Sequence, residues 1–379
     1  MRIGISVFGC AGGKTKGSGT SVYSKNLIKN LAIIDKVNEY YIFLSKDNEQ
    51  DFWYIAQNNF HFKVIAVRET GFTRLIFEQF ILPVLNIIYK IDVMHYTMPR
   101  MSFMYMSNSV ITVHDLMYKY YNENYQGYMP YFKYLYFDLN MKRVLKKANK
   151  IIAVSKYTAK DLQHYFRAAL NKINVVYEGV DPVFFKQPSE DIIKNCETKN
   201  KKYILTVKSN FPHKNLKGIL EAFILAKKKY NILHKLIILG YPGLISDELS
   251  QIIKKSNLEK EIVFIDSVSE ETLITLYKKA SLFIFLSLNE GFGLPILEAM
   301  AAGVPVLCSN RASLPEIAQD AAVIVDPLDV DKIAETINAC LSNEILRKEM
   351  IDKGLQRANG FSWRQTALQT LEVYNSAKA

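Results

Sequence analysis

The sequence predicts an α/β fold in which two doubly wound, Rossmann-like domains follow one another along the chain. Apolar runs that are too short for helices alternate with longer stretches of helical periodicity, which is typical of parallel sheets covered by helices. This pattern stops at residues 186–202, which are polar and lack apolar periodicity, and it starts again at Tyr203. The 379 residues are enough for two domains, each with its own hydrophobic core.

These patterns also set the expected domain boundaries. The first domain takes residues 1–185, and the polar segment 186–202 is an interdomain linker. The second domain takes residues 203–360, and residues 361–379 form a terminal helix.

Each expected strand is a short apolar run bounded by polar or turn-forming residues. In the first domain these runs are Arg2–Phe8, Tyr40–Leu44, Phe62–Val67, Asp92–His95 and Ser109–Val113. In the second domain they are Tyr203–Val207, Leu236–Gly240, Ile262–Ile265, Leu282–Leu286 and Val304–Cys308.

Two helices have clear capping residues, which are Ser155 or Thr158 for one and Ser269 for the other. A third helix, residues 72–90, is strongly apolar, and we expect it to be broken or kinked at Pro83. It is either a core helix of the first domain or an interfacial helix that lies on a membrane.

The net charge of +11 is concentrated in the first half of the chain. Residues 1–180 carry 23 Lys and Arg against 13 Asp and Glu, whereas the remaining residues carry 25 against 24. A basic half indicates an anionic partner, which is a phosphorylated substrate, an acidic membrane surface or a nucleic acid. A lysine-rich genome would explain the number of lysines but not their uneven distribution. Because the basic residues are spread over many elements and form no nucleic-acid-binding motif, we expect no nucleic-acid partner.

We find no apolar run of the roughly eighteen residues that span a bilayer, and we expect no cleavable signal after Met1. The four cysteines lie far apart without metal-type pairs, so free thiols in a reducing compartment are expected, at Cys10, Cys196, Cys308 and Cys340. We therefore predict a cytoplasmic protein. The basic charge, the helix at 72–90 and the eight tyrosines within Tyr118–Tyr136 predict peripheral contact with the anionic inner face of the cytoplasmic membrane.

The segment with the clearest functional signal is Ser281–Asn310. A buried strand leads into a loop with Gly291 and Gly293, which let a backbone approach a ligand closely, and a proline then fits the first turn of a helix. The unpaired N–H groups and positive dipole end at such a helix start suit a phosphate. Glu290 and Glu298 bracket the loop, and carboxylates suit the hydroxyl groups of a sugar.

The string from Glu290 to Glu298, EGFGLPILE, followed by AMAAGVPV, resembles the E-x7-E motif of retaining GT-B glycosyltransferases, and of glycosyltransferase family 4 in particular. The resemblance covers most of the chain and is strongest from Tyr203 to Tyr374. It implies the GT-B architecture, with two Rossmann-like domains that face a cleft and a C-terminal helix that crosses back to the first domain. In that architecture the first domain binds the acceptor and the second binds the nucleotide sugar.

The resemblance assigns roles to particular residues. Lys214, in the string PHKN, binds the diphosphate, which fits the need of a lysine near a helix start for an anion. Glu298 holds the ribose and Glu290 the hexose. The other expected donor contacts are Gly19, Ser209, Gly240, Tyr241, Val268, Gly291, Phe292, Gly293 and Leu294.

A histidine provides the third expected catalytic group, besides Lys214 and Glu290. His114 ends the strand in ITVHDL, at the edge where open α/β sheets bind ligands, and a histidine can donate or accept a hydrogen bond near neutral pH. By resemblance, His114 lies beside the transferred sugar.

The chain departs from the family pattern in three loops. Ser18 and Ser21 replace glycines of the first glycine-rich loop, although Gly19 matches. Lys208 stands before Ser209 where the family commonly has glycine, and Glu178 replaces the asparagine of Asn-Gly-Val-Asp.

No metal is expected. Asp329 and Asp331 mimic the D-x-D motif of the other glycosyltransferase fold, but their position at a helix start favours a capping role. The charge of the departing diphosphate would then be balanced by Lys214 and by helix amides. No cofactor is expected besides the GDP- or UDP-linked donor.

The sequence thus predicts a metal-independent, retaining hexosyltransferase that acts on a glycan or lipid-linked glycan in surface polysaccharide biosynthesis. Because PHKNL resembles mannosyl- and rhamnosyl-type members, GDP-mannose is the first choice of donor. The alternative is a non-catalytic nucleotide-sugar-binding subunit. A basic nucleic-acid-binding protein is a weaker alternative, because the chain has no motif for it.

Overall fold

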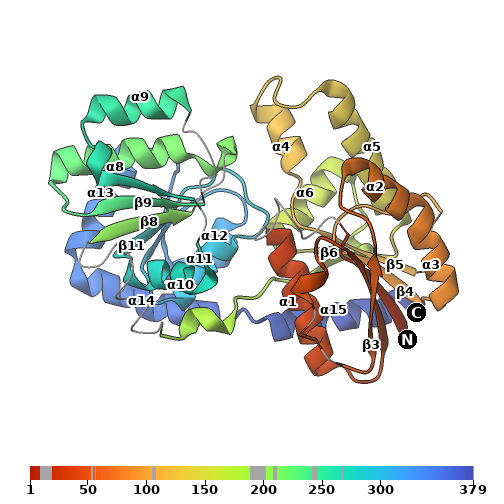
Figure 1. The fold of residues 1–379 in the computed structure, drawn as a ribbon. Coiled ribbons are helices and arrows are strands. Elements are labelled where there is room, and N and C mark those ends of the chain that lie inside the picture. Colours follow the sequence, from red (N-terminus) through yellow and green to blue (C-terminus); the bar gives the residue numbers. More distant parts are fainter. Residues whose placement is uncertain are drawn as a thin grey trace. The chain divides into compact units, whose positions relative to one another are not determined.

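A computed structural model describes residues 1–379 except 9–18, 53, 56, 105–107, 188–201, 208–210, 241–245, 267 and 379. The chain divides into two compact units (Figure 1). Unit 1 comprises Met1–Gly179 together with Ser362–Ala379, and unit 2 comprises Val180–Phe361. Each unit is a parallel sheet covered by helices, so the predicted α/β fold class is confirmed, including the return of the terminal helix to the first domain. Most of the expected linker lies outside the described residues.

The sheet of unit 1 has seven described strands in the order β3-β2-β1-β4-β5-β6-β7, and all its neighbouring pairs are parallel. The strands are β1 (Arg2–Ser6), β2 (Glu39–Ser45), β3 (Phe60–Ile65), β4 (Val93–Tyr96), β5 (Asn108–Val113), β6 (Lys150–Ala153) and β7 (Ile173–Val175). The five predicted strands are confirmed with shifts of one or two residues at their ends. The order in which strands are added to the sheet reverses between β1 and β4. The topological switch point of unit 1 therefore lies between these two neighbouring strands.

Helices cover both faces of this sheet (Figure 1). They are α1 (Gly19–Ile34), α2 (Gly71–Ile76), the π-helical segment η3 (Phe77–Ile81), α3 (Leu82–Tyr89), α4 (Met117–Asn124), α5 (Tyr131–Lys147), α6 (Lys156–Phe166) and α15 (Trp363–Lys378), with 3₁₀ turns η2 (Glu49–Asp51) and η4 (Leu170–Lys172). One core cluster joins the strands to the helical segment 71–89, α5 and α6. On the opposite face, α15 packs against α1, and its Tyr374 hydroxyl lies 2.7 Å from His95 Nδ1 on β4.

Residues Gly71–Tyr89 are helical throughout, so of the two alternatives predicted at Pro83, a break or a kink, the break is wrong. The proline instead lies in the first turn of α3, directly after the wider π-helical turn η3. A proline ring clashes with the carbonyl four residues before it, and a widened turn relieves that clash without ending the helix. By length and composition this 19-residue helix could cross a membrane. The expectation that no apolar segment is long enough to span a bilayer therefore does not hold for this helix, whose apolar residues are interrupted by Arg74 and Glu78.

The sheet of unit 2 has six described strands in the order β10-β9-β8-β11-β12-β13, again all parallel. They are β8 (Tyr203–Val207), β9 (Lys235–Leu239), β10 (Ile262–Ile265), β11 (Leu282–Phe285), β12 (Val306–Ser309) and β13 (Val323–Val325). The five predicted strands are confirmed. The switch point of unit 2 therefore lies between β8 and β11.

The helices of unit 2 are α8 (Leu216–Tyr230), α9 (Asp247–Ser256), α10 (Glu270–Lys279), α11 (Leu294–Ala301), α12 (Leu314–Ala318), α13 (Val330–Ser342) and α14 (Glu344–Asn359). Its 3₁₀ turns are η5 (Pro182–Phe185), η6 (Pro212–Lys214), η7 (Glu259–Glu261) and η8 (Gln319–Ala321). Ser155 in unit 1 and Ser269 in unit 2 cap their helices through side-chain oxygens, which confirms both predictions and selects Ser155 over Thr158.

Candidate functional site

Two predicted catalytic side chains meet at the switch point of unit 2. Lys214 follows β8, Glu290 follows the neighbouring strand β11, and Lys214 Nζ lies 2.6 Å from Glu290 Oε1. The two side chains are 19% and 14% exposed, so solvent screens this ion pair only in part. The Lys214 ammonium also lies 5.0 Å from the centre of the Phe285 ring, at the end of β11. This pair is the centre of the candidate site.

The surroundings of Lys214 differ from the sequence-based expectation. Lys214 does not open the helix but ends the 3₁₀ turn η6. The helix α8 begins at Leu216, and Asn215 caps it by accepting a hydrogen bond from the Gly218 N–H. The anion that Lys214 was expected to need is Glu290 of the same unit. A diphosphate would therefore have to share Lys214 with this carboxylate or replace it.

The loop that carries Glu290 is fixed by hydrogen bonds to two neighbouring segments. The Ser287 hydroxyl and the Leu288 N–H both donate to the His213 carbonyl, over 3.0 and 2.6 Å. The Ser313 hydroxyl lies 3.0 Å from the Glu290 carbonyl and 2.6 Å from the Phe292 carbonyl. Sequence reasoning missed both serines, because each contacts residues that are distant in the sequence and matches no motif. These bonds hold the loop in place before any ligand binds.

The glycine loop enters α11 through Gly293. This residue has a φ of 119°, and a Cβ at this position would lie 2.8 Å from Leu314 Cδ2. The positive φ requires glycine here, whereas the Leu314 side chain could shift to make room for a Cβ. Leu294 is the first residue of α11, and Pro295 lies in its first turn, as predicted. Gly303 follows the end of α11 with a φ of 72°. The first N–H groups of α11 thus face the end of the loop that carries Glu290.

Glu298 lies on α11 and contacts a tyrosine of the neighbouring helix. The Tyr277 hydroxyl of α10 donates to Glu298 Oε2 over 2.9 Å. Burial raises the pKa of Glu298 to about 7, with repulsion from Asp181 and Glu270 added and the Tyr277 hydrogen bond opposing. Sequence reasoning missed Tyr277, because an aromatic residue in a helix is usually an ordinary core residue. Its ring is indeed fully buried.

The other expected donor contacts are distributed over both units. In unit 2, Gly240 follows β9 with a φ of 82°, its N–H donates to the Ile265 and Asp266 carbonyls, and Val268 follows β10. Gly291 and Phe292 are buried in the loop before α11. Gly19 is the first residue of α1 in unit 1, and a Cβ there would meet nothing within 4 Å. Ser209, Tyr241 and Lys208 lie outside the described residues.

His114 is held by two acceptors within unit 1. Its Nδ1 lies 3.1 Å from Glu178 Oε1, and its Nε2 lies 3.1 Å from the Thr97 carbonyl oxygen. Because both partners accept hydrogen bonds, both ring nitrogens carry protons in this arrangement. Burial opposes the charged ring, but Glu178, Asp115 and the Thr97 carbonyl together raise the pKa of His114 above its usual value of 6.5. A sugar hydroxyl would have to replace the Thr97 carbonyl as the acceptor.

Replacing Glu178 with glutamine tests this charged pair. We expect the pKa of the His114 ring, measured by NMR titration, to fall in Glu178→Gln, since the variant removes the carboxylate charge. A histidine whose pKa is raised in the folded state stabilises the protein below its unfolded pKa of about 6.5. This contribution is lost as the pH rises through the folded-state pKa. The free energy of unfolding should therefore differ most between wild type and variant below about pH 6.5, and the difference should shrink as the pH rises through the folded-state pKa of His114.

Glu39→Gln is the matched control, because Glu39 Oε2 lies 2.6 Å from His61 Nε2 in a pair whose side chains are 46% and 35% exposed. Such an exposed pair contributes at most about 1 kcal/mol to stability. A His114 titration that is the same in Glu178→Gln and in wild type would contradict the assignment.

Two groups of aromatic side chains can be distinguished in and beside the tyrosine-rich stretch, an inner group and an exposed group. The inner group surrounds Lys119, whose Nζ lies 2.6 Å from Asp138 Oδ1 and 2.9 Å from the Tyr134 hydroxyl. The rings of Tyr118, Tyr134, Tyr165 and Phe166 lie 5.1–5.8 Å from this ammonium. These aromatic residues are therefore explained by the packing of a largely buried cation. The exposed group is Tyr128, Tyr131 and Tyr136.

Among the described residues, no three His, Cys, Asp or Glu side chains are grouped closely enough to hold a metal ion. Asp329 caps α13 by accepting a hydrogen bond from the Lys332 N–H over 2.9 Å. The predicted capping role of Asp329 is confirmed.

Two family profiles match consecutive parts of the chain. The profile described as Glycosyltransferase Family 4 matches residues 18–184, and the profile described as Glycosyl transferases group 1 matches residues 189–357. A solved structure with the same fold is that of HepE from Anabaena in complex with UDP-glucose, with a TM-score of 0.74, 17% identity and coverage of 99% of this chain and 100% of that chain. This similarity confirms the GT-B fold.

Two curated relatives are named as mannosyltransferases. The chain is 32% identical to O-antigen chain mannosyltransferase B of Escherichia coli over 65% of this chain and 66% of that protein. It is 31% identical to the O-antigen chain mannosyltransferase RfbU of Salmonella typhimurium over 62% of this chain and 60% of that protein. The matched part thus spans 66% of the length of the first relative and 60% of the second, which is less than two thirds of each.

Proposed function

This chain belongs to the GT-B glycosyltransferases of family 4, and we propose that it transfers a hexose from a nucleotide sugar to a glycan or lipid-linked glycan. The observation that carries the proposal is the ion pair of Lys214 with Glu290 beside the start of α11. A cation, a carboxylate and helix amides at one switch point supply what a diphosphate-linked sugar needs.

In the proposed reaction the bond between the anomeric carbon and the diphosphate breaks. The diphosphate leaves with the bonding electrons, and Lys214 and the amides at the start of α11 stabilise its charge. As Lys214 turns to the diphosphate, Glu290 is released to accept hydrogen bonds from the hexose. Glu298 accepts hydrogen bonds from the ribose hydroxyls.

The acceptor hydroxyl forms the new bond to the anomeric carbon on the face that the diphosphate leaves, so the configuration is retained. The departing phosphate takes the proton of that hydroxyl. This scheme needs neither a carboxylate nucleophile nor a metal ion. We assign His114 a contact with the hexose, through an N–H that exchanges the Thr97 carbonyl for a sugar hydroxyl.

The relatives support a mannosyl donor and a role in surface polysaccharide synthesis. Both curated relatives are named as O-antigen chain mannosyltransferases, at about 30% identity to this chain. GDP-mannose is therefore the first donor to test, and UDP-hexoses are the second because HepE binds UDP-glucose. We propose that the reaction takes place in the cytoplasm, at the inner face of the membrane.

A panel of nucleotide sugars tests the proposal. The full chain is incubated with GDP-mannose, UDP-glucose, UDP-galactose and UDP-N-acetylglucosamine, and free GDP or UDP and the mass of any product are measured. We expect slow hydrolysis of one donor and faster turnover with a polysaccharide or lipid-linked acceptor. Tight binding without any turnover would favour the non-catalytic subunit. The absence of both binding and turnover with every donor of the panel would overturn the proposal.

A further inference from the structure

One face of the helical segment Gly71–Tyr89 is exposed and entirely apolar. We call it the apolar face, and its members are Phe72, Leu75, Phe80, Val84, Ile87 and Ile88, which are 43–71% exposed. Their spacing follows the helix, with one extra residue at the π-helical turn between Leu75 and Phe80. A contiguous exposed stripe of this kind marks a surface that binds another apolar surface.

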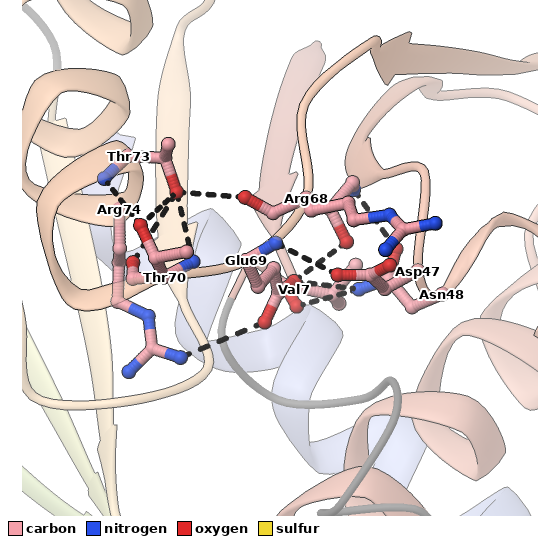
Figure 2. A network of polar contacts seen from close by, with 9 residues as sticks. Val7, Asp47, Asn48, Arg68, Glu69, Thr70, Thr73 and Arg74 are labelled. Carbon is pink, nitrogen blue, oxygen red and sulfur yellow. Dashed lines mark hydrogen bonds and ion pairs between the residues drawn. The ribbon is translucent and has the colours of Figure 1, made fainter.

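The opposite face of the same segment is packed into unit 1. The Phe77 ring stacks on Phe8 with centroids 4.2 Å apart, and Leu82 is 1% exposed in the core. Capping at Thr70 and the ion pair of Arg74 with Glu69 fix the start of the segment, and Glu69 is tied in turn to the loop after β2 (Figure 2). A helix held along one side in this way presents its apolar face outward and lies on a surface instead of crossing it.

The apolar face continues onto a neighbouring loop and onto α5. The Ser102 hydroxyl donates to the Gln79 carbonyl, and the Gln79 side chain accepts from the Phe103 N–H. The Arg143 guanidinium of α5 lies 3.9 Å above the Phe103 ring and donates to the Ser102 carbonyl. Further exposed apolar side chains follow on these elements, namely Phe103, Met104, Tyr131, Phe132, Tyr136 and Leu139.

The helix α5 adds positive charge beside these side chains. It carries five basic residues and one acidic residue, Asp138. Of the basic residues, Lys133, Lys142, Lys146 and Lys147 are exposed. A helix with exposed aromatic and basic residues is typical of proteins that lie on anionic membranes.

We propose that the apolar face, residues 103–104 and α5 form one docking surface for an anionic lipid bilayer. Charge complementarity favours this occupant, because a second copy of the chain would bring the same lysines against each other. The apolar and aromatic side chains enter the interfacial layer, and the lysines contact lipid phosphates. The proposal does not rest on the glycosyl transfer, since it concerns a surface that holds none of the residues assigned to the donor.

Vesicle flotation of the full chain tests the proposal, with vesicles of phosphatidylglycerol and phosphatidylcholine compared with pure phosphatidylcholine. We expect binding to the anionic vesicles that weakens as salt is added, because salt screens the lysine–phosphate attraction. Phe72→Ser/Phe80→Ser should lower the partition coefficient at least about tenfold, since two aromatic side chains no longer enter the bilayer. Lys133→Glu/Lys146→Glu should lower it by a similar or larger factor, because each lysine contributes about fivefold.

Leu233→Ser is the control for the apolar variant, because Leu233 is 82% exposed in unit 2, outside the docking surface. Circular dichroism melting should show the same folding for all variants. Equal binding of wild type and both double variants would overturn the proposal. The proposal would also be overturned if the wild type bound no vesicles but formed a dimer in light scattering, and if Phe72→Ser/Phe80→Ser dissociated that dimer. Donor hydrolysis in solution should be unchanged in the double variants, which separates this test from that of the proposed function.

Discussion

Lys214→Ala is expected to lower the turnover number for donor breakdown by about 10²- to 10³-fold, the usual cost of losing one preorganised group that stabilises transition-state charge. The reason lies in the pair with Glu290, at 2.6 Å. Without the ammonium, the diphosphate loses its cation and also meets an unpaired carboxylate. The change should therefore appear more strongly in kcat than in KM, and release of GDP or UDP under saturating donor measures it.

Lys217→Ala is the matched control for this variant. Lys217 lies in the first turn of α8, its side chain is 54% exposed, and it pairs with Glu248 at 2.7 Å. We expect its turnover to match wild type. Lys214→Arg should restore part of the activity, because the charge is kept but the position of the donors changes. A turnover number of Lys214→Ala within about threefold of wild type would remove Lys214 from the proposed mechanism.

Glu298→Ala is expected to weaken donor binding by about 10- to 100-fold, the cost of losing hydrogen bonds to a charged acceptor. Isothermal titration with the active donor measures this affinity. Glu335→Ala, which removes an exposed carboxylate paired with Lys332, is the control and should bind as wild type does. Unchanged affinity in Glu298→Ala would show that the ribose is held elsewhere.

The affinity of the wild type should also depend on pH through Glu298. Since burial raises its pKa to about 7, the carboxylate is protonated below that pH and accepts fewer hydrogen bonds. Donor affinity should therefore rise as the pH rises through 7. The same raised pKa means that the folded state holds an extra proton between the ordinary value of 4.5 and 7, so the contribution of this group to stability falls over that window.

Tyr277→Phe separates this effect from other titrations. The Tyr277 hydrogen bond lowers the pKa of Glu298, so its loss should move the pH midpoint of donor binding upward. The ring itself is kept, with its contacts to Phe283 and Phe184 at 5.3 and 5.7 Å between centroids. A midpoint that does not move would show that another group causes the pH dependence.

The fold was predictable because periodicity is a local property of the sequence. Runs such as Leu282–Leu286 are recognisable without knowing what packs on them, and the strand β11 ends within one residue of the prediction. Pro83 shows the limit of this reasoning. A proline predicts a break, but the backbone widened into a π-helical turn because the buried side of the helix is fixed by its packing on the sheet.

The candidate site was predictable in its residues but not in their partners. Sequence reasoning proposed Lys214, Glu290 and Glu298 separately. It had no means of finding the hydrogen bond from Tyr277 to Glu298, or those from Ser313 to the loop that carries Glu290. These contacts join residues that are far apart in the chain. Sequence reasoning also noted Glu178 only as a departure from a family pattern, whereas the structure shows it beside His114.

By itself, the sequence determined the two α/β units, the glycine loop before α11 and the acidic residues on either side of that loop. The reason is that strand and helix periodicity, and the need for glycine in a turn, depend on residues that are close in the sequence. Only the tertiary structure decided that the lysine after β8 is paired with the glutamate after β11, and that one side of the Gly71–Tyr89 helix is buried while the other is exposed. The physical reason is that strand order and packing bring distant residues together. Charge pairing and burial, and with them the pKa values, depend on those distant neighbours.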